Sequence, residues 1–282
     1  MKIVVFGKTG QVARVLAQYP DVICLIRSAA DLTQPEQCAK MIRQYRPDAV
    51  INAAAYTQVD GAETEEVLAT VLNADAPTAM AAACAAIGVG FVHISTDYVF
   101  DGTGTSAMLP EHQSQPLGAY GRSKRHGESG VIAAGGRYVI LRTSWAFSSH
   151  GTNFLKTMLR LYQTRDALNI VSDQIGGPTP AAAIAAACHA IVHALVTGTG
   201  ASGIYHFSSR PDVSWASFAA EIFAQSGRKV AITAIATKDY TTPAKRPLNS
   251  RLNCDNLQQA FGIQRPDWRS GLADLCKEIE VM

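Results

Sequence analysis

Charged side chains are scarce in this chain of 282 residues, in which 17% are charged and 48% are hydrophobic. Soluble proteins average about 25% charged residues, so this composition excludes a disordered or coiled-coil chain. The charges are also nearly balanced, with 25 basic and 23 acidic residues and no long run of either sign. The sequence lacks a basic stripe that could neutralise a phosphate backbone, and we expect no nucleic-acid partner.

Closely spaced cysteines are absent as well. The six cysteines lie far apart with no CxxC pair, which predicts neither a zinc site nor a dense disulfide framework. The apolar residues after Met1 reach Gly7 too soon to form a signal-peptide core. Polar residues interrupt the Ala-rich segments before they reach the roughly 18 apolar residues needed to span a bilayer. We expect a cytoplasmic protein with no membrane partner.

Apolar runs of strand length alternate with longer segments of helical period over residues 1–173. This alternation is typical of βαβ units in a parallel sheet that is buried on both faces. It predicts an α/β fold with a doubly wound, Rossmann-like parallel sheet. The expected strands are 2–7, 22–26, 49–55, 89–95, 138–144 and 169–172. The expected helices are 11–19, 35–45, 63–87, 120–133 and 153–163.

The pattern changes after about Asp173, where we expect a second, smaller unit. We interpret residues 174–282 mainly as a substrate-binding cap with segments that return to the dinucleotide-binding domain of residues 1–173. Such a cap would cover the carboxyl edge of the sheet, where ligands of open α/β sheets bind. The elements expected here are a helix at 181–195, a strand at 204–208, a helix at 215–226, a strand at 230–236 and a proline-punctuated stretch at 242–247.

A glycine turn directly follows the first expected strand. Gly7 and Gly10, with Ala13, form the pattern G-x-x-G-x-x-A at the start of a helix. In this position backbone N–H groups and the helix N-terminus can meet a pyrophosphate. A tight strand-to-helix turn that binds nothing would also need glycine, because glycine adopts positive φ without strain.

The second expected strand ends near Arg27. A dinucleotide-binding fold places either an acid on the ribose 2′-OH or an arginine beside a 2′-phosphate at this point. The arginine favours NADPH over NADH, and a solvated strand-end arginine is the alternative. Asp31 and Leu32 could lie beside the adenine, or Asp31 could cap the helix that begins at Pro35.

Tyr120 and Lys124 stand four residues apart at the start of an expected helix, so both side chains project from one face. A neighbouring ammonium group lowers a phenol's pKa from about 10 towards the range in which the phenol is a useful acid. Thr96, at the end of the fourth expected strand, brings a hydroxyl to the same carboxyl edge. Each feature alone has a structural explanation. Together with the glycine turn, they predict hydride transfer to or from a carbonyl carbon.

Two further clusters attract attention but predict no chemistry. His189 and His193 are four residues apart, but the segment lacks the glutamate of an H-E-x-x-H zinc motif, so we assign no metal ligands. The acidic residues Glu63, Glu65 and Glu66 suit the positive end of a helix dipole, and we interpret them as a helix start.

In this order, the motifs resemble those of the extended short-chain dehydrogenase/reductases, and within that superfamily the dTDP-4-dehydrorhamnose reductase family. The resemblance covers nearly the whole chain. The most specific part of the resemblance lies in the expected substrate-binding cap. Other Rossmann-like proteins have no reason to share these residues. The matching segments are 6–12, 52–57 with 59–60 and 62–63, 95–100, 120–121 with 124, 142–145, 173–174 with 177–179, and 246–247 with 249–252.

The resemblance implies a role for each matching residue. The implied reaction delivers hydride from NAD(P)H to C4 of dTDP-4-dehydro-L-rhamnose and yields dTDP-L-rhamnose. Tyr120 would protonate the oxygen, Lys124 would tune Tyr120 and hold the nicotinamide ribose, and Thr96 would polarise the carbonyl. The implied cofactor-binding residues are Gly7, Gly10, Gln11, Val12, Ala55, Tyr56 and Thr57. The implied sugar contacts are Thr96, Asp97 and Trp145, with Arg251 as a candidate for the diphosphate.

The chain departs from the family pattern in two respects. The family's acid near the end of the second expected strand is not obvious here, which leaves the cofactor preference open. Some members dimerise through magnesium held by glutamates, one of them soon after the glycine turn, but residues 11–16 contain no carboxylate. A magnesium-linked dimer is therefore in doubt, and we expect a monomer or a homodimer. The alternative functions are a reductase of another 4-keto nucleotide sugar and a non-catalytic, NADP-binding regulatory subunit. The joint presence of Thr96, Tyr120 and Lys124 argues against the second.

Overall fold

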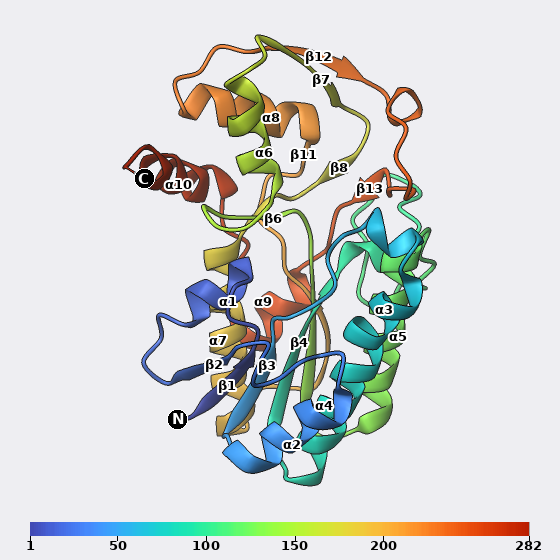
Figure 1. The fold of residues 1–282 in the computed structure, drawn as a ribbon, viewed down its shortest axis with the longest axis vertical. Helices are drawn as coiled ribbons and strands as arrows, with labels where there is room; N and C mark the ends of the chain where they lie inside the picture. The colour runs from blue at the N-terminus through green and yellow to red at the C-terminus, as the bar shows by residue number, and fades with distance from the viewer. Residues whose placement is uncertain (282) are drawn as a thin grey trace.

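The computed structural model describes residues 1–281 and contains a central six-stranded sheet (Figure 1). Every strand pair in this sheet is parallel. All four residues of the inner strand β1 are buried, as expected for a parallel sheet with helices on both faces. The strands, in spatial order, are β10 (Gly203–His206), β5 (Tyr138–Thr143), β4 (Gly90–Thr96), β3 (Ala49–Asn52), β1 (Ile3–Phe6) and β2 (Val22–Leu25).

Helices cover both faces of this sheet, and each face has its own apolar core. One face packs against α1 (Gln11–Leu16), α7 (Ala181–Thr197) and α9 (Asp255–Phe261). The other face packs against α2 (Pro35–Tyr45), α4 (Ala76–Ala86) and α5 (Ala119–Ala134). This arrangement confirms the predicted doubly wound α/β fold.

The helix expected over residues 63–87 is interrupted in the structure. The stretch consists of η1 (Gly61–Glu63), α3 (Glu66–Thr70), a π-helical turn η2 (Val71–Asp75) and α4. Pro77, in the first turn of α4, cannot donate a backbone hydrogen bond, which explains the altered winding just before it. By length and composition Glu66–Ala86 could cross a membrane, but half of it is buried inside the protein, as in the core helix of a globular domain.

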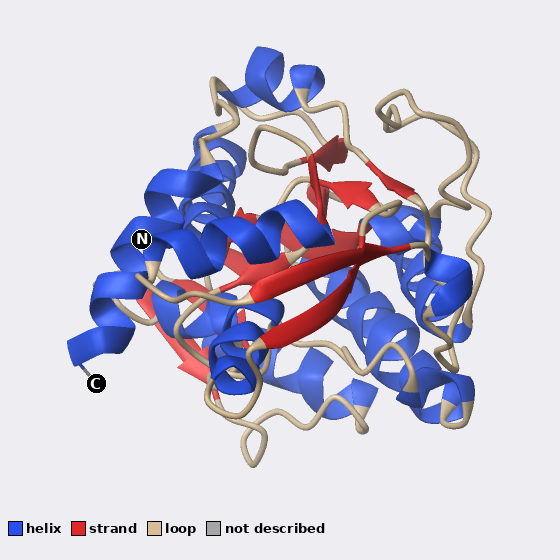
Figure 2. Ribbon diagram, turned by 90° about the horizontal axis from the view of Figure 1, so that it is seen from above, coloured by secondary structure: helices blue, strands red, loops and turns tan. Residues whose placement is uncertain are grey.

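A smaller cap lies beyond the carboxyl ends of the main strands, in the upper part of Figure 1, and Figure 2 looks down on it from above. Its apolar core joins α6 (Phe154–Tyr162), α8 (Trp215–Gln225) and α10 (Trp268–Val281). Its small sheets pair β7 with β12, β6 with β9, and β8 with both β11 and β13. The remaining elements are β6 (Ala146–Phe147), β7 (Ala167–Val171), β8 (Ile175–Gly176), β9 (Thr179–Pro180), β11 (Val213–Ser214), β12 (Ala231–Ile235), β13 (Asn249–Ser250), η3 (Asp97–Val99) and η4 (Thr237–Asp239).

Two expected strands lie in the opposite unit from the one predicted. The strand expected at 169–172 in the main sheet is β7, which pairs with β12 in the cap. The strand expected at 204–208 in the cap is β10, which pairs with β5 at the edge of the main sheet. Burial alternates along the first part of β7, which suits a sheet covered on one face, but the strand's own sequence does not name its partner. Leu155 and Leu168 also join the cap core, so that core extends across residue 173.

Candidate active site

The glycine turn lies between β1 and α1 at the carboxyl edge of the sheet. Gly7 has a φ of +102°, and a Cβ there would lie 3.3 Å from the Ala54 Cβ, so the fold itself requires glycine. Gly10 is the N-cap of α1 with a φ of −68°, where any residue could stand. A Cβ at Gly10 would meet only the Ala53 carbonyl oxygen, at 3.8 Å. The absence of a side chain at Gly10 therefore leaves room beside the turn rather than relieving strain.

The two residues that open α1 have different surroundings. The Gln11 side-chain oxygen accepts hydrogen bonds from the Ser148 hydroxyl and the Asn153 amide, both at 2.9 Å. Asn153 is the N-cap of α6, so Gln11 ties the glycine turn to the cap. Val12 packs against the apolar core of the sheet. Backbone N–H groups in the first turn of a helix have no partner within it, so the backbone here can still meet an anion.

The residues expected near the adenosine lie after β2. Arg27 is exposed, and its guanidinium lies 3.2 Å from the Asp31 carboxylate. Asp31 also accepts a hydrogen bond from the Thr33 backbone N–H, whereas the N-cap of α2 is Gln34, so Asp31 does not cap that helix. Leu32 is buried in the apolar core beneath α2. Arg27 is therefore the member of this group with a freely accessible charged side chain.

A buried asparagine organises the loop after β3. Asn73, in the π-helical turn, accepts a hydrogen bond from the Tyr56 backbone N–H and donates to the Tyr56 carbonyl oxygen. It also donates to the Ser123 hydroxyl on α5, at 3.0 Å. Ala55 is half-buried and Thr57 is exposed on either side of Tyr56. Sequence reasoning missed Asn73, whose one signal was an amide within an apolar helical segment.

The three glutamates interpreted as a helix start do lie in η1 and at the start of α3, and each also holds another group. Glu63 accepts a hydrogen bond from the Ala119 backbone N–H at the start of α5, and Glu65 accepts one from the Tyr56 hydroxyl. Glu66 does begin α3, and it forms a bidentate ion pair with Arg122 of α5. The acidic cluster thus fixes the end of α5 that carries Tyr120.

Tyr120 and Thr96 come together where α5 begins and β4 ends. Thr96 accepts a hydrogen bond from the Tyr98 backbone N–H and donates to Asp97 Oδ1, at 3.1 Å. Burial raises the pKa of Tyr120 to about 12, and a hydrogen bond with Thr96 limits the rise. Tyr98 packs edge-on against the Tyr120 ring, with 5.6 Å between ring centroids. Tyr120 is therefore a protonated, oriented donor at neutral pH.

Lys124 lies one helical turn further along α5 and is almost completely buried. Its Nζ donates to the Ile94 carbonyl oxygen at 2.7 Å and lies 3.3 Å from His93 Nε2. Burial lowers the pKa of Lys124 to about 8, while Glu128 opposes the shift. Burial and the Lys124 charge lower the pKa of His93 well below its ordinary value, so the ring is neutral.

The hydrogen-bond network assigns the proton of that ring. Asn52 Oδ1 accepts a hydrogen bond from the Ala54 N–H, so its amide nitrogen faces His93 Nδ1, at 3.1 Å. Nδ1 is then the acceptor, and the one N–H of the neutral ring is Nε2–H, which points at Lys124. His93, which sequence reasoning missed, therefore offers the Lys124 ammonium group no acceptor.

Asp97 offers an unused acceptor beside Thr96. The residue is 3% exposed, and its Oδ2 has no hydrogen-bond partner among the described residues. Burial raises the pKa of Asp97 to about 6, against hydrogen bonds from Ser250 and Thr96 that lower it. Buried polar atoms are nearly always paired, so this oxygen suits a hydroxyl group of a ligand.

Trp145 forms an aromatic wall together with a residue that sequence reasoning missed. It follows β5 in a left-handed conformation with a φ of +48°, a strained geometry for a bulky side chain that is often found at functional sites. Its ring stacks on Trp215 of α8, with centroids 3.5 Å apart and planes 11° apart. Trp215 in turn donates to the Gln174 side-chain oxygen. The signal for Trp215 was an aromatic residue at the first position of an expected helix.

The proline-punctuated stretch brings the remaining predicted residue to this edge. Arg246 forms an ion pair of 2.8 Å with Asp60 in the loop after β3, and the Ala244 N–H donates to the same carboxylate. Arg251 follows β13 and donates to the Asn249 side-chain oxygen at 3.0 Å. Among the described residues no carboxylate pairs with Arg251. Its positive charge is therefore available to an anion.

A glycine turn after β1, a strand-end threonine and a Y-x-x-x-K pair on α5 define a Rossmann-like reductase of the short-chain dehydrogenase/reductase class. A family model described as the RmlD substrate binding domain matches residues 1–281. A dTDP-4-dehydrorhamnose reductase from Burkholderia thailandensis is 44% identical over 286 residues, covering 95% of this chain and 96% of that protein. The chain belongs to the dTDP-4-dehydrorhamnose reductase family, as its motifs predicted.

Solved structures agree with this assignment. A dTDP-4-dehydrorhamnose reductase from Clostridium acetobutylicum superposes with a TM-score of 0.93 at 34% identity, covering 99% of this chain and all of that one. The enzyme of the same name from Bacillus anthracis, solved in complex with NADP, gives a TM-score of 0.92 at 34% identity and the same coverage. The fold of both units is therefore that of the family.

Proposed function

We propose that this protein is a dTDP-4-dehydrorhamnose reductase, which reduces the C4 ketone of dTDP-4-dehydro-L-rhamnose to the alcohol of dTDP-L-rhamnose with NADPH or NADH. The observation that carries the proposal is the assembly of Thr96, Tyr120 and Lys124 at the sheet's carboxyl edge, in a chain so similar to reductases of this name. The regulatory-subunit alternative does not explain why all three groups are present at one edge of the sheet.

The residues present fit a bound dinucleotide. Gly10 leaves room beside the turn, and the first turn of α1 presents backbone N–H groups to a pyrophosphate. The exposed Arg27 suits a 2′-phosphate, which favours NADPH. Ala55, Tyr56 and Thr57 would border the cofactor from the loop after β3. The reduced nicotinamide supplies the hydride when it is bound.

The chain's own residues would supply the proton and stabilise the negative charge that develops on the ketone oxygen. Thr96 would turn its hydroxyl hydrogen from Asp97 Oδ1 to the ketone oxygen, which gains negative charge as the hydride arrives at C4. Tyr120 would give its phenolic proton to that oxygen and complete the C4 hydroxyl. Lys124 would stabilise the phenolate that remains and return a proton to it. Hydride and proton together account for the two hydrogens added.

The cap-side residues would hold the sugar nucleotide. Asp97 Oδ2, which has no partner among residues 1–281, would accept a hydrogen bond from a sugar hydroxyl. The Trp145 ring would pack against the sugar, and Arg251 would bind the diphosphate through its planar guanidinium. We also propose a cytoplasmic enzyme, because buried thiols such as Cys38 and Cys188 suit a reducing compartment. Helix α1 has no acidic residue, so a dimer would not use a magnesium ligand from it.

The decisive experiment follows cofactor oxidation with enzymatically prepared dTDP-4-dehydro-L-rhamnose. We expect rapid oxidation, formation of dTDP-L-rhamnose and a higher kcat/KM with NADPH than with NADH. Cofactor oxidation with another 4-keto nucleotide sugar, but not with dTDP-4-dehydro-L-rhamnose, would favour the first alternative, a reductase of that other sugar. Cofactor binding without turnover of any 4-keto nucleotide sugar would favour the regulatory alternative.

A further inference from the structure

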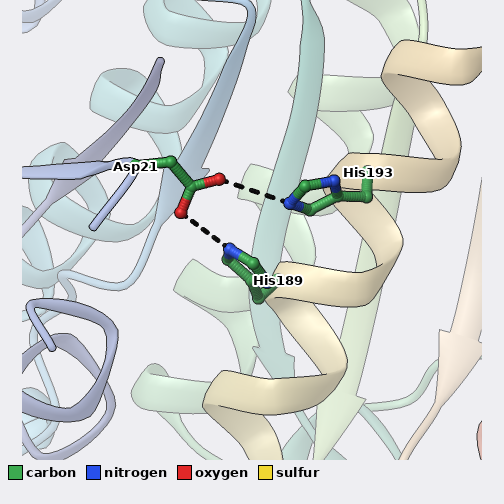
Figure 3. A group of neighbouring side chains, drawn as sticks. All are labelled: Asp21, His189 and His193. Carbon is green, nitrogen blue, oxygen red and sulfur yellow. Dashed lines mark hydrogen bonds and ion pairs between the residues drawn. The ribbon is translucent and has the colours of Figure 1, made fainter. Parts of the chain in front are cut away.

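A second cluster of ligating side chains lies outside the reductase site (Figure 3). Asp21, in the turn before β2, points its carboxylate between His189 and His193, which are one helical turn apart on α7. Asp21 Oδ1 lies 2.9 Å from His189 Nε2, and Oδ2 lies 3.3 Å from His193 Nε2. From the sequence alone we assigned no metal to the histidine pair, because its segment lacks the H-E-x-x-H glutamate. Asp21, the third possible ligand, lies 168 positions from His189.

Rigid elements hold all three side chains. The Ile3 N–H donates to the Asp21 carbonyl oxygen, and the Val22 N–H donates to the Tyr19 carbonyl oxygen, which together fix the turn. The Tyr19 ring stacks on His189, with centroids 4.1 Å apart, and orients that imidazole. Helix α7 is anchored in the apolar core of the sheet. The ligand atoms are therefore positioned before any ion arrives.

The geometry and chemistry match a transition-metal ion. One ligand atom from each residue can be chosen so that all three lie within 4.8 Å of one another. Zinc bonds of about 2.0–2.2 Å in a tetrahedron place neighbouring donors about 3.3 Å apart, so only small movements are needed. Two imidazoles with one carboxylate favour zinc over magnesium or calcium, which prefer oxygen donors alone.

The exposure of the cluster agrees with this choice. The His193 side chain is 46% exposed, against 19% for Asp21 and His189. The open side at His193 leaves space for a water molecule as a fourth ligand.

We propose that Asp21, His189 and His193 bind one zinc ion, which clamps α7 to the turn before β2. Asp21 directly precedes β2 and therefore lies at the amino edge of the parallel sheet, whereas Thr96 and Tyr120 lie at the carboxyl edge. The ion stabilises the main domain and takes no part in hydride transfer. Each imidazole bonds the ion through the nitrogen that now faces Asp21, and its proton moves to the other ring nitrogen.

The test uses full-length protein without a histidine tag, stripped of metal with a chelator and titrated with zinc chloride by calorimetry. We expect one zinc per chain, and at least tenfold weaker binding in both His193→Gln and Asp21→Asn, since each variant removes one ligand. His126→Gln is the matched control, because His126 is an exposed histidine on α5 outside the cluster. This variant should bind zinc like the wild type.

Two further measurements distinguish zinc binding at the proposed site from non-specific zinc binding elsewhere on the protein. Zinc at a hundredfold excess over its Kd should raise the Tm by about 5 °C in the wild type but not in His193→Gln. Cobalt should give the visible absorption of a tetrahedral complex, again lost in His193→Gln. The partly buried Cys24 lies nearby in β2, and Cys24→Ser should leave binding unchanged.

Three results would overturn the proposal. They are the absence of saturable zinc binding by the wild type, equal binding by the wild type and both ligand variants, and loss of binding in Cys24→Ser. None of them bears on the reductase, because the cluster shares no residue with Thr96, Tyr120 and Lys124.

Discussion

Helix α5 carries two buried charges one turn apart, and their surroundings differ sharply. Glu128 is fully buried, and its Oε1 accepts hydrogen bonds from the Ser95 hydroxyl and from Arg142 Nε, at 2.6 and 2.8 Å. Its Oε2 accepts a third hydrogen bond from Arg142, at 2.7 Å. Lys124 is 2% exposed and contacts one carbonyl oxygen and one neutral imidazole. One charge is fully paired and the other is not.

This difference separates a group that holds the fold from a group that is suited to chemistry. The bidentate pair between Glu128 and Arg142 joins α5 to β5. Breaking it by removing Arg142 would leave the Glu128 carboxylate in the core without its guanidinium partner. The Arg142 charge also contributes, after burial, to lowering the pKa of His206 to about 3, so that neighbour stays neutral. Lys124 lacks such a partner, and its pKa falls to about 8, near the pH at which an enzyme works.

Removing the phenol should produce the largest effect on activity with little effect on the fold. Tyr120→Phe keeps the ring that packs on Tyr98 and deletes the proton donor, so we expect kcat/KM to fall by about 10²–10⁴-fold. Dinucleotide binding, measured by fluorescence titration, should remain near the wild-type level. A variant that retains most of its turnover would show that Tyr120 is not the acid.

Breaking the ion pair between Glu128 and Arg142 should instead have a large effect on the stability of the fold. Arg142→Met leaves Glu128 buried without its bidentate partner, while the Ser95 hydroxyl and Arg125, 3.9 Å away, remain, and we expect the free energy of unfolding in urea to fall by about 3–5 kcal/mol. Arg122→Met is the matched control, because the Arg122–Glu66 pair is 40% and 44% exposed and should contribute less than about 1 kcal/mol. Equal losses in the two variants would contradict the contrast drawn between buried and exposed pairs.

The pH dependence should show a smaller, graded effect from Lys124. The ammonium loses its charge as the pH rises through about 8, so kcat/KM should fall above that pH, by up to about tenfold per unit. The folded-state pKa lies below the ordinary value of 10.5, so the unfolded chain binds more protons between these values. The contribution of Lys124 to stability should therefore rise with pH over the range in which activity falls.

A matched variant tests this assignment. Lys124→Arg keeps a positive charge at every accessible pH, so its residual activity should lack the decline above pH 8. Rate profiles of both proteins, with unfolding measured at each pH, provide the comparison. An identical decline in the variant would assign the titration to another group.

The parts of the site that were predicted correctly depend on neighbours in the sequence. Gly7 was identified because a tight turn after a strand needs positive φ, and Tyr120 and Lys124 share a face because they are four residues apart on one helix. The main sheet followed from the alternation of strand and helix periods. The exchange of β7 and β10 between the two units was not foreseeable, because a strand of either kind has similar local chemistry.

The groups that were missed all act through partners far away in the chain. His93 meets Lys124 across 31 positions, and Asn73 meets Ser123 across 50. Glu63 reaches the start of α5 across 56 positions, although its own neighbours suggested only a helix start. Each of these residues looked ordinary within its own segment.

The sequence by itself determined the element types, the family and the identity of the reactive side chains, because periodicity, turn geometry and motif spacing are local properties. Only the tertiary structure decided which buried charged groups are paired with an opposite charge and which are not. Desolvation and pairing depend on atoms that folding brings together from distant segments. For this reason Glu128 is paired with Arg142, whereas Lys124, one turn away on the same helix, donates to a backbone carbonyl oxygen.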